Sequence, residues 1–507
     1  MKIFILLLIP FTLLFAQDTT KSEAFKRDLP KGRSSLHQPK YPSYPLLTGF
    51  VIQQEANNGD PFAQHEFGIR LLFGNGFQPD TTKAIFWIQK AASQNISAAR
   101  FNLAIMYYNE IGVDWNPFSA YKNFQFAAES GMPEAQFAYG IFFTENLVVN
   151  KDLAQAYKWF KKAADKDYEP AIESLEYLKE LGYDLIDEKE FKDDDSQYVL
   201  EKSQISSLIQ QDWSFDYFDF GEDTLSSEKE KEIVENLLTE NKDELKRKLG
   251  VSDLRNTETI EDTSSLGIIN FAAETGSPEA LFFTATASEM GIVTKRNIVD
   301  AAYKYLRAYR LGSQKAALRL LQIVKDRNIF QTLKSEVDDN NADAMYTWAG
   351  LIALGFDNSL SDMQAYELLE RAAKQNHINS IIEIGLSYYS GTLVKEDRQK
   401  AIEYWMRAAD LGSKEAEVRI AFANISLEKD DYSDEINILR INANQGSVLA
   451  QTALAYCYEN GIGVRARKSM AARLYRQAAS RGNVTAFNSL KRMYDELRPG
   501  EEEFNIY

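Results

Sequence analysis

The stretch from Tyr456 to Tyr475 has two features that could do chemistry. Residues 461–466, "GIGVRA", fit the pattern G-x-G-x-x-A, which is close to the glycine-rich turn that holds a dinucleotide pyrophosphate. The chain's single cysteine, Cys457, lies just before this turn, and Arg467 and Lys468 follow it. A dinucleotide turn must follow a β-strand, whereas the residues before Gly461 have helical periodicity. The elements around the glycines must therefore decide between a cofactor site and an ordinary turn.

Other candidate chemistry is weaker. Asp212, Asp216 and Asp219 in "DWSFDYFDFGED" could suggest calcium, but they lack the Asp-x-Asp-x-Asp-Gly spacing and the closing Glu of an EF-hand. Three histidines and one cysteine leave little for a zinc or iron–sulfur site. No Ser-His-Asp, Cys-His or paired-carboxylate arrangement can be assembled. The sequence thus predicts no catalytic residue, no metal and no cofactor.

The composition predicts an ordered protein that does not bind nucleic acid. Hydrophobic residues make up 45% of the 507, enough for a large core. The formal net charge is −17 and the isoelectric point is about 4.9, whereas a general nucleic-acid binder needs a basic surface.

The N-terminus predicts export. Lys2 precedes an almost unbroken apolar run over residues 3–15, which has the length of a signal peptide, with cleavage expected after Ala16. No second hydrophobic span follows, so we expect a mature chain without a transmembrane segment, either periplasmic or secreted. In an oxidising compartment Cys457 has no intramolecular partner. It is either buried or available for an intermolecular disulfide, and burial is favoured.

A repeat of 36 residues organises most of the chain. The alanine pairs at 91–92, 127–128 and 163–164 are 36 residues apart, and so are Ala344, Ser380 and Ala416. If the first small residue of each unit is position zero, an alanine stands at +21 and a large apolar residue at +25 in seven units. Each unit has two stretches of helical period separated by turn residues. Because two helices cannot bury their apolar stripes alone, neighbouring units must stack.

These units closely resemble Sel1-like repeats, which are relatives of the tetratricopeptide repeat. The resemblance rests on "AQFAYGIFFTENLVVNKDLAQAYKWFKKAADKDYEPA" and "SIIEIGLSYYSGTLVKEDRQKAIEYWMRAADLGSKEA", and is best at 63–95, 135–167, 380–412 and 450–482. It implies an all-α fold, a right-handed α-solenoid of antiparallel helix pairs in two blocks.

The repeat also explains the glycine cluster. Position +11 is a glycine in five units, before the second helix each time: Gly74, Gly291, Gly355, Gly391 and Gly461. A turn between antiparallel helices needs a residue that tolerates positive φ, and glycine does so without a steric penalty. We therefore predict that these five glycines are structural turns and that the cluster at 461 is not a cofactor site.

Loss of the repeat marks the boundaries. We expect a signal peptide at 1–16, a flexible linker at 17–57, a first repeat block at 58–183, an acidic insertion or linker at 184–262, a second repeat block at 263–496 and an acidic, frayed tail at 497–507. The insertion is unusually aromatic for a linker. We expect its aromatic residues to dock on a solenoid groove or on a partner: Trp213, Phe215, Tyr217, Phe218 and Phe220.

The resemblance to tetratricopeptide arrays implies that the first helices line a concave face at positions −1, +2, +6 and +9. Packing between helices is the alternative role for each residue there. The partner-binding residues expected on this basis are Phe62, His65, Phe101, Ile105, Tyr108, Phe137, Ile141, Tyr346, Ile382, Tyr389 and Tyr456. An aromatic-lined groove suits the capture of a peptide or helix.

The sequence therefore predicts a non-enzymatic adaptor of the bacterial cell envelope that binds a protein or peptide ligand. By resemblance, envelope enzymes and sensor proteins are candidate partners. A secreted factor that engages host or neighbouring-cell proteins is the alternative. A β-lactam-binding hydrolase of the cysteine-rich Sel1-like type is less favoured, because that branch carries paired cysteines and this chain has one.

Overall fold

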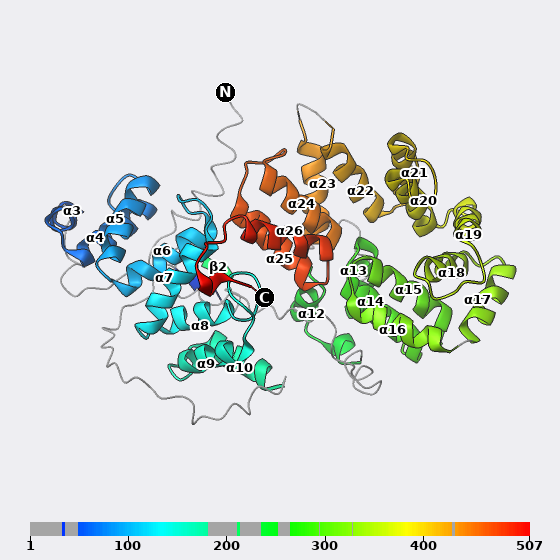
Figure 1. Cartoon of the computed structure of the whole chain (residues 1–507), viewed down its shortest axis with the longest axis horizontal. Coiled ribbons are helices and arrows are strands. Elements are labelled where there is room, and N and C mark those ends of the chain that lie inside the picture. The colour runs from blue at the N-terminus through cyan, green and yellow to red at the C-terminus, as the bar shows by residue number, and fades with distance from the viewer. Residues whose placement is uncertain are drawn as a thin grey trace. The chain divides into compact units, whose positions relative to one another are not determined.

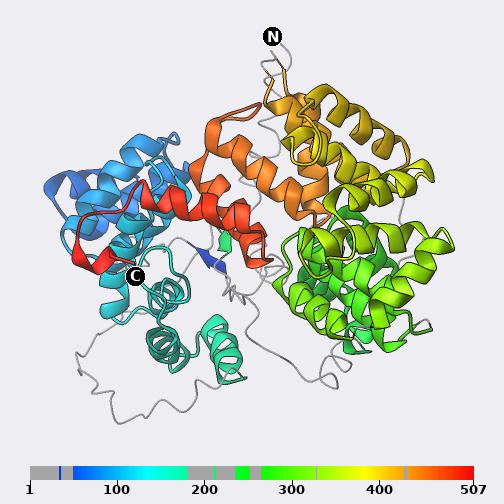
Figure 2. The ribbon, with the colours of Figure 1, turned by 45° about the vertical axis from the view of Figure 1, so that its right-hand side comes forward.

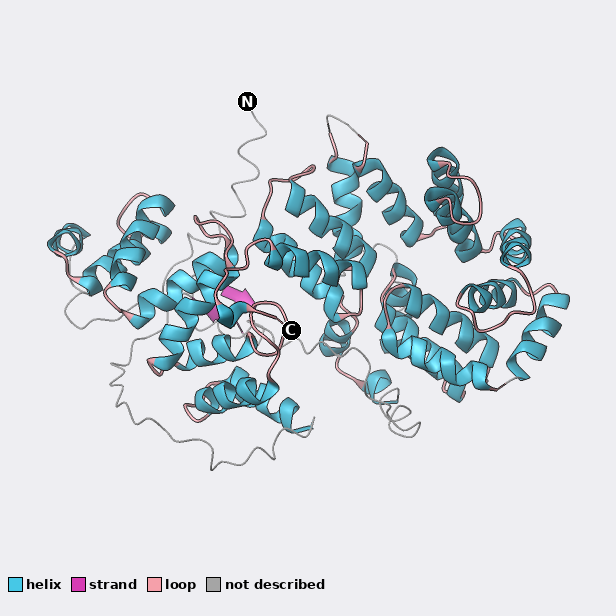
Figure 3. Cartoon of the chain, viewed as in Figure 1, coloured by secondary structure: helices cyan, strands magenta, loops and turns pink. Residues whose placement is uncertain are grey.

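The computed structural model describes residues 33–35, 49–180, 210–212, 235–251, 264–293, 295–326, 328–427 and 431–506. Over these residues the chain is helical, apart from the antiparallel pair of short strands β1 (Arg33–Ser35) and β2 (Gln210–Asp212) (Figures 1 and 3). The predicted all-α solenoid of helix pairs is confirmed. The expected signal peptide and the aromatic segment 213–220 lie outside the described residues.

The chain divides into two compact units, residues 1–217 with 493–507 and residues 218–492. Unit 1 contains α3 (Gly49–Asn58), α4 (Pro61–Phe73), α5 (Thr81–Ser93), α6 (Ser97–Asn109), α7 (Pro117–Glu129), α8 (Pro133–Ile141), α9 (Leu153–Ala164), α10 (Glu169–Glu180) and the 3₁₀ turn η4 (Glu502–Phe504).

Unit 2 begins with α12 (Lys242–Lys248) and ends within α26. Its helices are α13 (Ser265–Thr275), α14 (Pro278–Met290), α15 (Ile298–Arg310), α16 (Gln314–Lys325), α17 (Asn328–Asp338), α18 (Ala342–Ala353), α19 (Asp362–Lys374), α20 (Ile378–Ser390), α21 (Arg398–Asp410), α22 (Lys414–Ile425), α23 (Ser433–Asn444), α24 (Val448–Asn460), α25 (Lys468–Ser480) and α26 (Val484–Asp495). None of the described helices in either unit is long and apolar enough to cross a membrane.

Each repeat is built from the same local signals. The second helix begins after a polar N-cap, as where Asp80 accepts from the Lys83 amide at 2.9 Å, and Asn116 and Asp152 repeat this cap 36 residues apart. Four first helices end at a left-handed glycine, namely Gly74, Gly291, Gly391 and Gly461, and Gly355 follows one residue after the C-cap of α18. All five predicted turn glycines have φ between 69° and 76°.

A small residue lets the two helices of a pair approach closely. At Gly68 on α4, an added Cβ would lie 2.7 Å from the Ile88 side chain and 2.9 Å from the Ala84 carbonyl oxygen on α5. Gly140 meets Phe160 in the same way. Any larger side chain at these positions would push the pair apart.

Two predicted boundaries were wrong. The flexible linker at 17–57 is too long, because α3 already buries Ile52 and Ala56, and Ala56 precedes Ala92 by one repeat length. The frayed tail is also wrong. Phe504 is fully buried, with its ring 5.0 Å from that of Phe118, and Arg498 donates to the Leu147 carbonyl at 2.8 Å. The repeat pattern could not show that an apolar residue beyond the last repeat has a site to fill.

The insertion contributes to unit 2. Leu245 on α12 and the following Leu249 and Val251 are buried in the core of that unit. Only part of the acidic segment 184–262 is described, namely β2 and residues 235–251.

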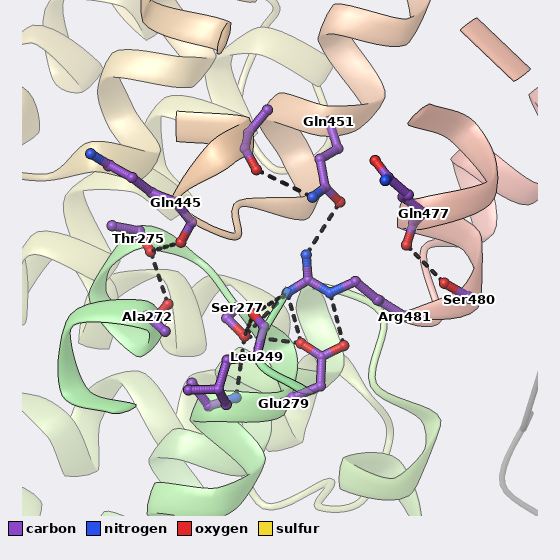
Figure 4. A network of polar contacts seen from close by, with 12 residues as sticks. Leu249, Ala272, Thr275, Ser277, Glu279, Gln445, Gln451, Gln477, Ser480 and Arg481 are labelled. Carbon is purple, nitrogen blue, oxygen red and sulfur yellow. Dashed lines mark hydrogen bonds and ion pairs between the residues drawn. The ribbon is translucent and has the colours of Figure 1, made fainter. Parts of the chain in front are cut away.

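The first and last repeats of unit 2 touch. In Figures 1 and 2 the green ribbon of α13 and α14 lies beside the orange ribbon of α24 and α25. Arg481, in the turn after α25, donates to both carboxylate oxygens of Glu279 at 2.9 and 2.7 Å and to the Leu249 carbonyl at 3.2 Å (Figure 4). Thr275 donates to the Gln445 carbonyl at 2.9 Å. Segments about 200 residues apart are thus joined by side chains and backbone.

Candidate functional site

The structure places the eleven predicted partner-binding residues in three environments. Tyr108 and Tyr389 are half-buried, while Phe62 and Tyr456 are each 40% exposed. The remaining seven are buried: His65, Phe101, Ile105, Phe137, Ile141, Tyr346 and Ile382. No partner is present, so binding by this set stays a prediction.

Most of the buried members join helices within the array. The ring of Phe101 meets that of Phe124 edge-on at 5.6 Å, and that of Phe137 meets Phe160 at 5.1 Å. His65 Nε2 lies 2.7 Å from the side-chain nitrogen Nδ2 of Asn102, which lies on the first helix of the next repeat. These side chains can shape the surface of unit 1 but cannot reach a ligand themselves.

One exposed aromatic pair stands on neighbouring first helices of unit 2. Tyr456 on α24 and Phe422 on α22 have ring centroids 6.0 Å apart, and Phe422 is 37% exposed. Phe422 was not predicted. The repeat contained the signal, because both residues occupy position +6, counted from Ala416 and Ala450. We call these two residues the aromatic pair.

Unit 2 also has a polar pocket on its first helices and α15. Repeat spacing brings its residues together: Tyr346 and Ile382 both occupy position +2, and Glu383 and Arg419 both occupy position +3. The pocket has about 280 Å³ of atom-free space, which includes open solvent. Its lining is Arg307, Arg310, Leu311, Tyr346, Asn379, Ile382, Glu383, Glu415 and Arg419.

Two ion pairs lie in the lining of this pocket, one between α15 and α20 and one within α22. Arg310 pairs with Glu383, and Arg419 pairs with Glu415 at 2.6 Å. Burial opposes ionisation of Glu415, but Arg419, Arg307 and Arg310 outweigh it and hold the pKa of this carboxyl below its usual range. Glu415 is therefore charged at neutral pH, although only 14% of its side chain is exposed.

An aromatic and polar group borders the pocket. The ring of Tyr303 lies 5.5 Å from Tyr346 and 5.7 Å from His377, and His377 Nε2 lies 3.1 Å from Asp343. Asn379 donates to the Tyr303 hydroxyl. Burial raises the pKa of Tyr303 to about 12, so its hydroxyl keeps its proton at neutral pH.

Only Tyr346 and Ile382 of this lining were predicted. The predicted partner-binding residues stand at positions −1, +2, +6 and +9, so Glu383 and Arg419 at position +3 were missed. The available signal was polar residues repeating at 36, such as Glu383 and Arg419 at +3 and Asn379 and Glu415 at −1. Arg307 lies on a second helix at position +27, where Arg371 and Arg407 also stand, but the prediction covered positions on the first helices only.

The cysteine that most resembled a reactive residue in the sequence is buried in the structure. Cys457 is fully buried, and burial raises the pKa of its thiol to about 12. Gly461 ends α24 in the left-handed conformation, with φ at 71°, and so follows a helix. Within the described residues, no group of three or more His, Cys, Asp or Glu side chains could hold a metal ion.

Comparison with known proteins identifies the repeat. The Sel1 repeat matches residues 61–96, 97–132, 133–168, 278–313, 359–377, 379–413 and 448–483. The intervening segments 314–358 and 414–447, which the family pattern does not match, contain α16 to α18, α22 and α23. Of these helices, α18 and α22 contribute residues to the pocket.

Curated relatives match short stretches. DAP3-binding cell death enhancer 1 from Mus musculus is 31% identical over 108 residues, 21% of each chain. A putative sel1-like repeat-containing protein L21 from Acanthamoeba polyphaga mimivirus is 29% identical over 133 residues, 20% of this chain and 25% of the relative. The matches thus span a quarter or less of these relatives.

Two solved structures are similar. A protective antigen of uropathogenic Escherichia coli with an SLR fold is 19% identical, covering 89% of this chain and 83% of the antigen, with a TM-score of 0.31. A Sel1 repeat protein from Oxalobacter formigenes is 31% identical, covering 25% of this chain and 96% of that protein, with a TM-score of 0.24. Neither likeness carries a functional conclusion at these TM-scores. Sel1 repeats imply a protein–protein interaction scaffold, and with seven of them this chain is a Sel1-like repeat protein.

Proposed function

We propose that this protein is a non-enzymatic adaptor of the bacterial cell envelope, which binds a partner protein or peptide through the first helices of its repeats. The observation that carries the proposal is the aromatic pair of Phe422 and Tyr456. Single exposed apolar residues are common on any surface, but here two aromatic rings meet at equivalent positions of adjacent repeats. Large, rigid aromatic side chains are frequent anchors of protein interfaces.

The charged groups near the pair support a peptide ligand. Arg419 lies one helical turn before Phe422 on α22. On α24, Glu459 follows Tyr456 closely; its side chain is 9% exposed and pairs at 2.6 Å with Arg492, which is 50% exposed. Apolar contacts beside charged groups can fix both the position and the direction of a bound chain.

The test is an affinity pull-down from envelope extract with the full chain. We expect Phe422→Ala/Tyr456→Ala to lose a partner that the wild type retains, because both anchors are truncated. Met363→Ala/Met406→Ala is the matched control, since these side chains are 53% and 54% exposed but lie on the second helices α19 and α21. Phe101 and Phe137 are unsuitable targets because both are buried.

The outcome is decided by comparing the two double variants. If the Phe422/Tyr456 variant is folded by circular dichroism and still retains every wild-type partner, the aromatic pair is not the binding surface. Loss of the same partners in the methionine control would also contradict the assignment.

Localisation needs its own experiment. The export proposal rests on the apolar run at residues 3–15. Release by osmotic shock supports a periplasmic adaptor, whereas recovery from culture supernatant supports the alternative of a secreted factor that engages host or neighbouring-cell proteins. Retention in the cytoplasm without loss of the N-terminal residues contradicts both.

A further inference from the structure

The charges that line the unit 2 pocket do not balance. Arg307, Arg310 and Arg419 face two carboxylates, Glu383 and Glu415. Arg310 is paired with Glu383 and Arg419 with Glu415. The lining therefore has one excess positive charge, in a chain whose net charge is −17.

The excess charge belongs to Arg307. Within the described part of the chain, Arg307 makes no ion pair, and its guanidinium lies over the Tyr303 ring at 5.8 Å from the centroid. It lines the pocket, where its positive charge helps to hold the pKa of Glu415 below its usual range. Arg307 is half-buried, which leaves it accessible to a ligand while limiting its hydration.

The other neighbouring charge does not neutralise Arg307. The negative charge of Asp343 helps to raise the pKa of Tyr303 at the border of the pocket. Asp343 does not line the pocket itself, is 47% exposed and contacts His377. The two carboxylates inside the pocket each already have a close partner, Glu383 in Arg310 and Glu415 in Arg419.

The form of the pocket favours a small monoanion. The enclosed part admits about one water-sized group, which suits a single oxygen atom. A phosphate dianion would bring excess negative charge beside Glu383 and Glu415, whereas one carboxylate would neutralise the lining. Arginine forms strong charge-assisted hydrogen bonds to carboxylates.

We propose that this pocket binds a carboxylate group of the partner chain, with Arg307 as its principal ligand. This rests on the proposed function for the nature of the partner as a protein or peptide. The carboxylate belongs either to an Asp or Glu side chain or to a C-terminus, and the two sources share the same chemistry at Arg307.

Fluorescence anisotropy with labelled hexapeptides tests the proposal on the full chain. One probe has Glu side chains and an amidated C-terminus, a second has Ser and Gly with a free C-terminus, and a third is the same Ser and Gly peptide amidated. We expect the first or second probe to bind more tightly than the third, and the stronger of the two identifies the source. Arg307→Gln should weaken that probe at least tenfold.

Two further variants separate binding from folding. Arg398→Gln makes the same charge change at a side chain that is 65% exposed and should leave binding unchanged. Glu383→Gln releases Arg310 and removes a competing carboxylate, so it should tighten binding of the carboxylate probe, a gain that misfolding cannot produce.

The outcomes are distinct. Equal affinity for all three peptides, wild-type affinity in Arg307→Gln or weaker binding in Glu383→Gln would each overturn the carboxylate assignment. Acetate and inorganic phosphate are also added as competitors of the bound probe, and displacement by phosphate at the concentration at which acetate acts would overturn it too. Because these assays use Arg307 and defined peptides, their failure leaves the pull-down with Phe422→Ala/Tyr456→Ala as a separate test of the adaptor function.

Discussion

Arg481→Ala tests whether the contact between the first and last repeats of unit 2 stabilises that unit. Arg481 donates five hydrogen bonds, to Glu279 twice, to Gln451, to Ser277 and to the Leu249 carbonyl (Figure 4). All but the one to Gln451 bridge segments more than 200 residues apart. The substitution removes every one of them and leaves the Glu279 carboxylate without its cation.

The expected loss of unfolding free energy is about 3 kcal/mol. Breaking a fully buried ion pair by removing one partner costs about 3–5 kcal/mol. The Arg481 side chain is 10% exposed, but that of Glu279 is 33% exposed. Water can therefore rehydrate the carboxylate in part, which places the estimate at the lower end of that range.

Urea unfolding followed by circular dichroism measures the loss, and amide hydrogen exchange locates it. Protection should fall both in α13–α14 and in α24–α25, while α18–α21 should change little, because Arg481 contacts the two ends of the unit. Arg398→Ala, which removes an exposed ion pair to Glu396, is the control and should change stability by less than about 0.5 kcal/mol. A loss equal to the control, or faster exchange near α25 alone, would refute the reasoning.

Three other predictions concern buried groups. Gly482→Ala should destabilise unit 2 by at least about 2 kcal/mol in urea unfolding, because a methyl group there would overlap the facing Gly312 carbonyl. The control Gly412→Ala, at a residue with φ of 93° and no atom nearby, should cost less, and equal losses would contradict the close approach of Gly482 to Gly312. Phe504→Ala should lower the stability of unit 1 by about 3–5 kcal/mol in thermal unfolding, and no change would mean that the tail is not docked. Burial raises the pKa of the Cys457 thiol to about 12, so a thiol-labelling reagent at pH 8 should react with it only after denaturation. For the same reason, the stability that the protonated thiol contributes should decline as pH rises from about 9 to 12. Rapid labelling of the folded chain would contradict the burial of Cys457.

The regular part of the fold was predictable because each repeat encodes it locally. Asp80 at an N-cap, Gly461 at positive φ and Gly68 at a close helix contact each act within one helix pair. A period of 36 residues then repeats the same pair, and stacking follows from the apolar faces. The boundaries were less predictable, since α3 and Phe504 belong to the fold without completing a repeat.

The candidate site was harder to predict because burial depends on how successive pairs stack. Position alone could not separate Tyr456, which is 40% exposed, from Ile105, which is fully buried, because both occupy position +6. Repeat comparison alone would have found Phe422 and Glu383. Arg307 shares position +27 with Arg371 and Arg407, but its place in the pocket depends on the packing of α15 against α18.

The sequence by itself determined the helix pair, its turns and its repetition, since these depend on residues within one repeat of each other. It also predicted correctly that the glycine cluster at 461 is a turn that follows a helix. Only the tertiary structure decided that Arg481 meets Glu279, that Phe504 fills a site beside Phe118, and that Arg307 faces Glu415. The physical reason is that small rotations between successive repeats accumulate along a solenoid, and their sum decides which distant segments touch.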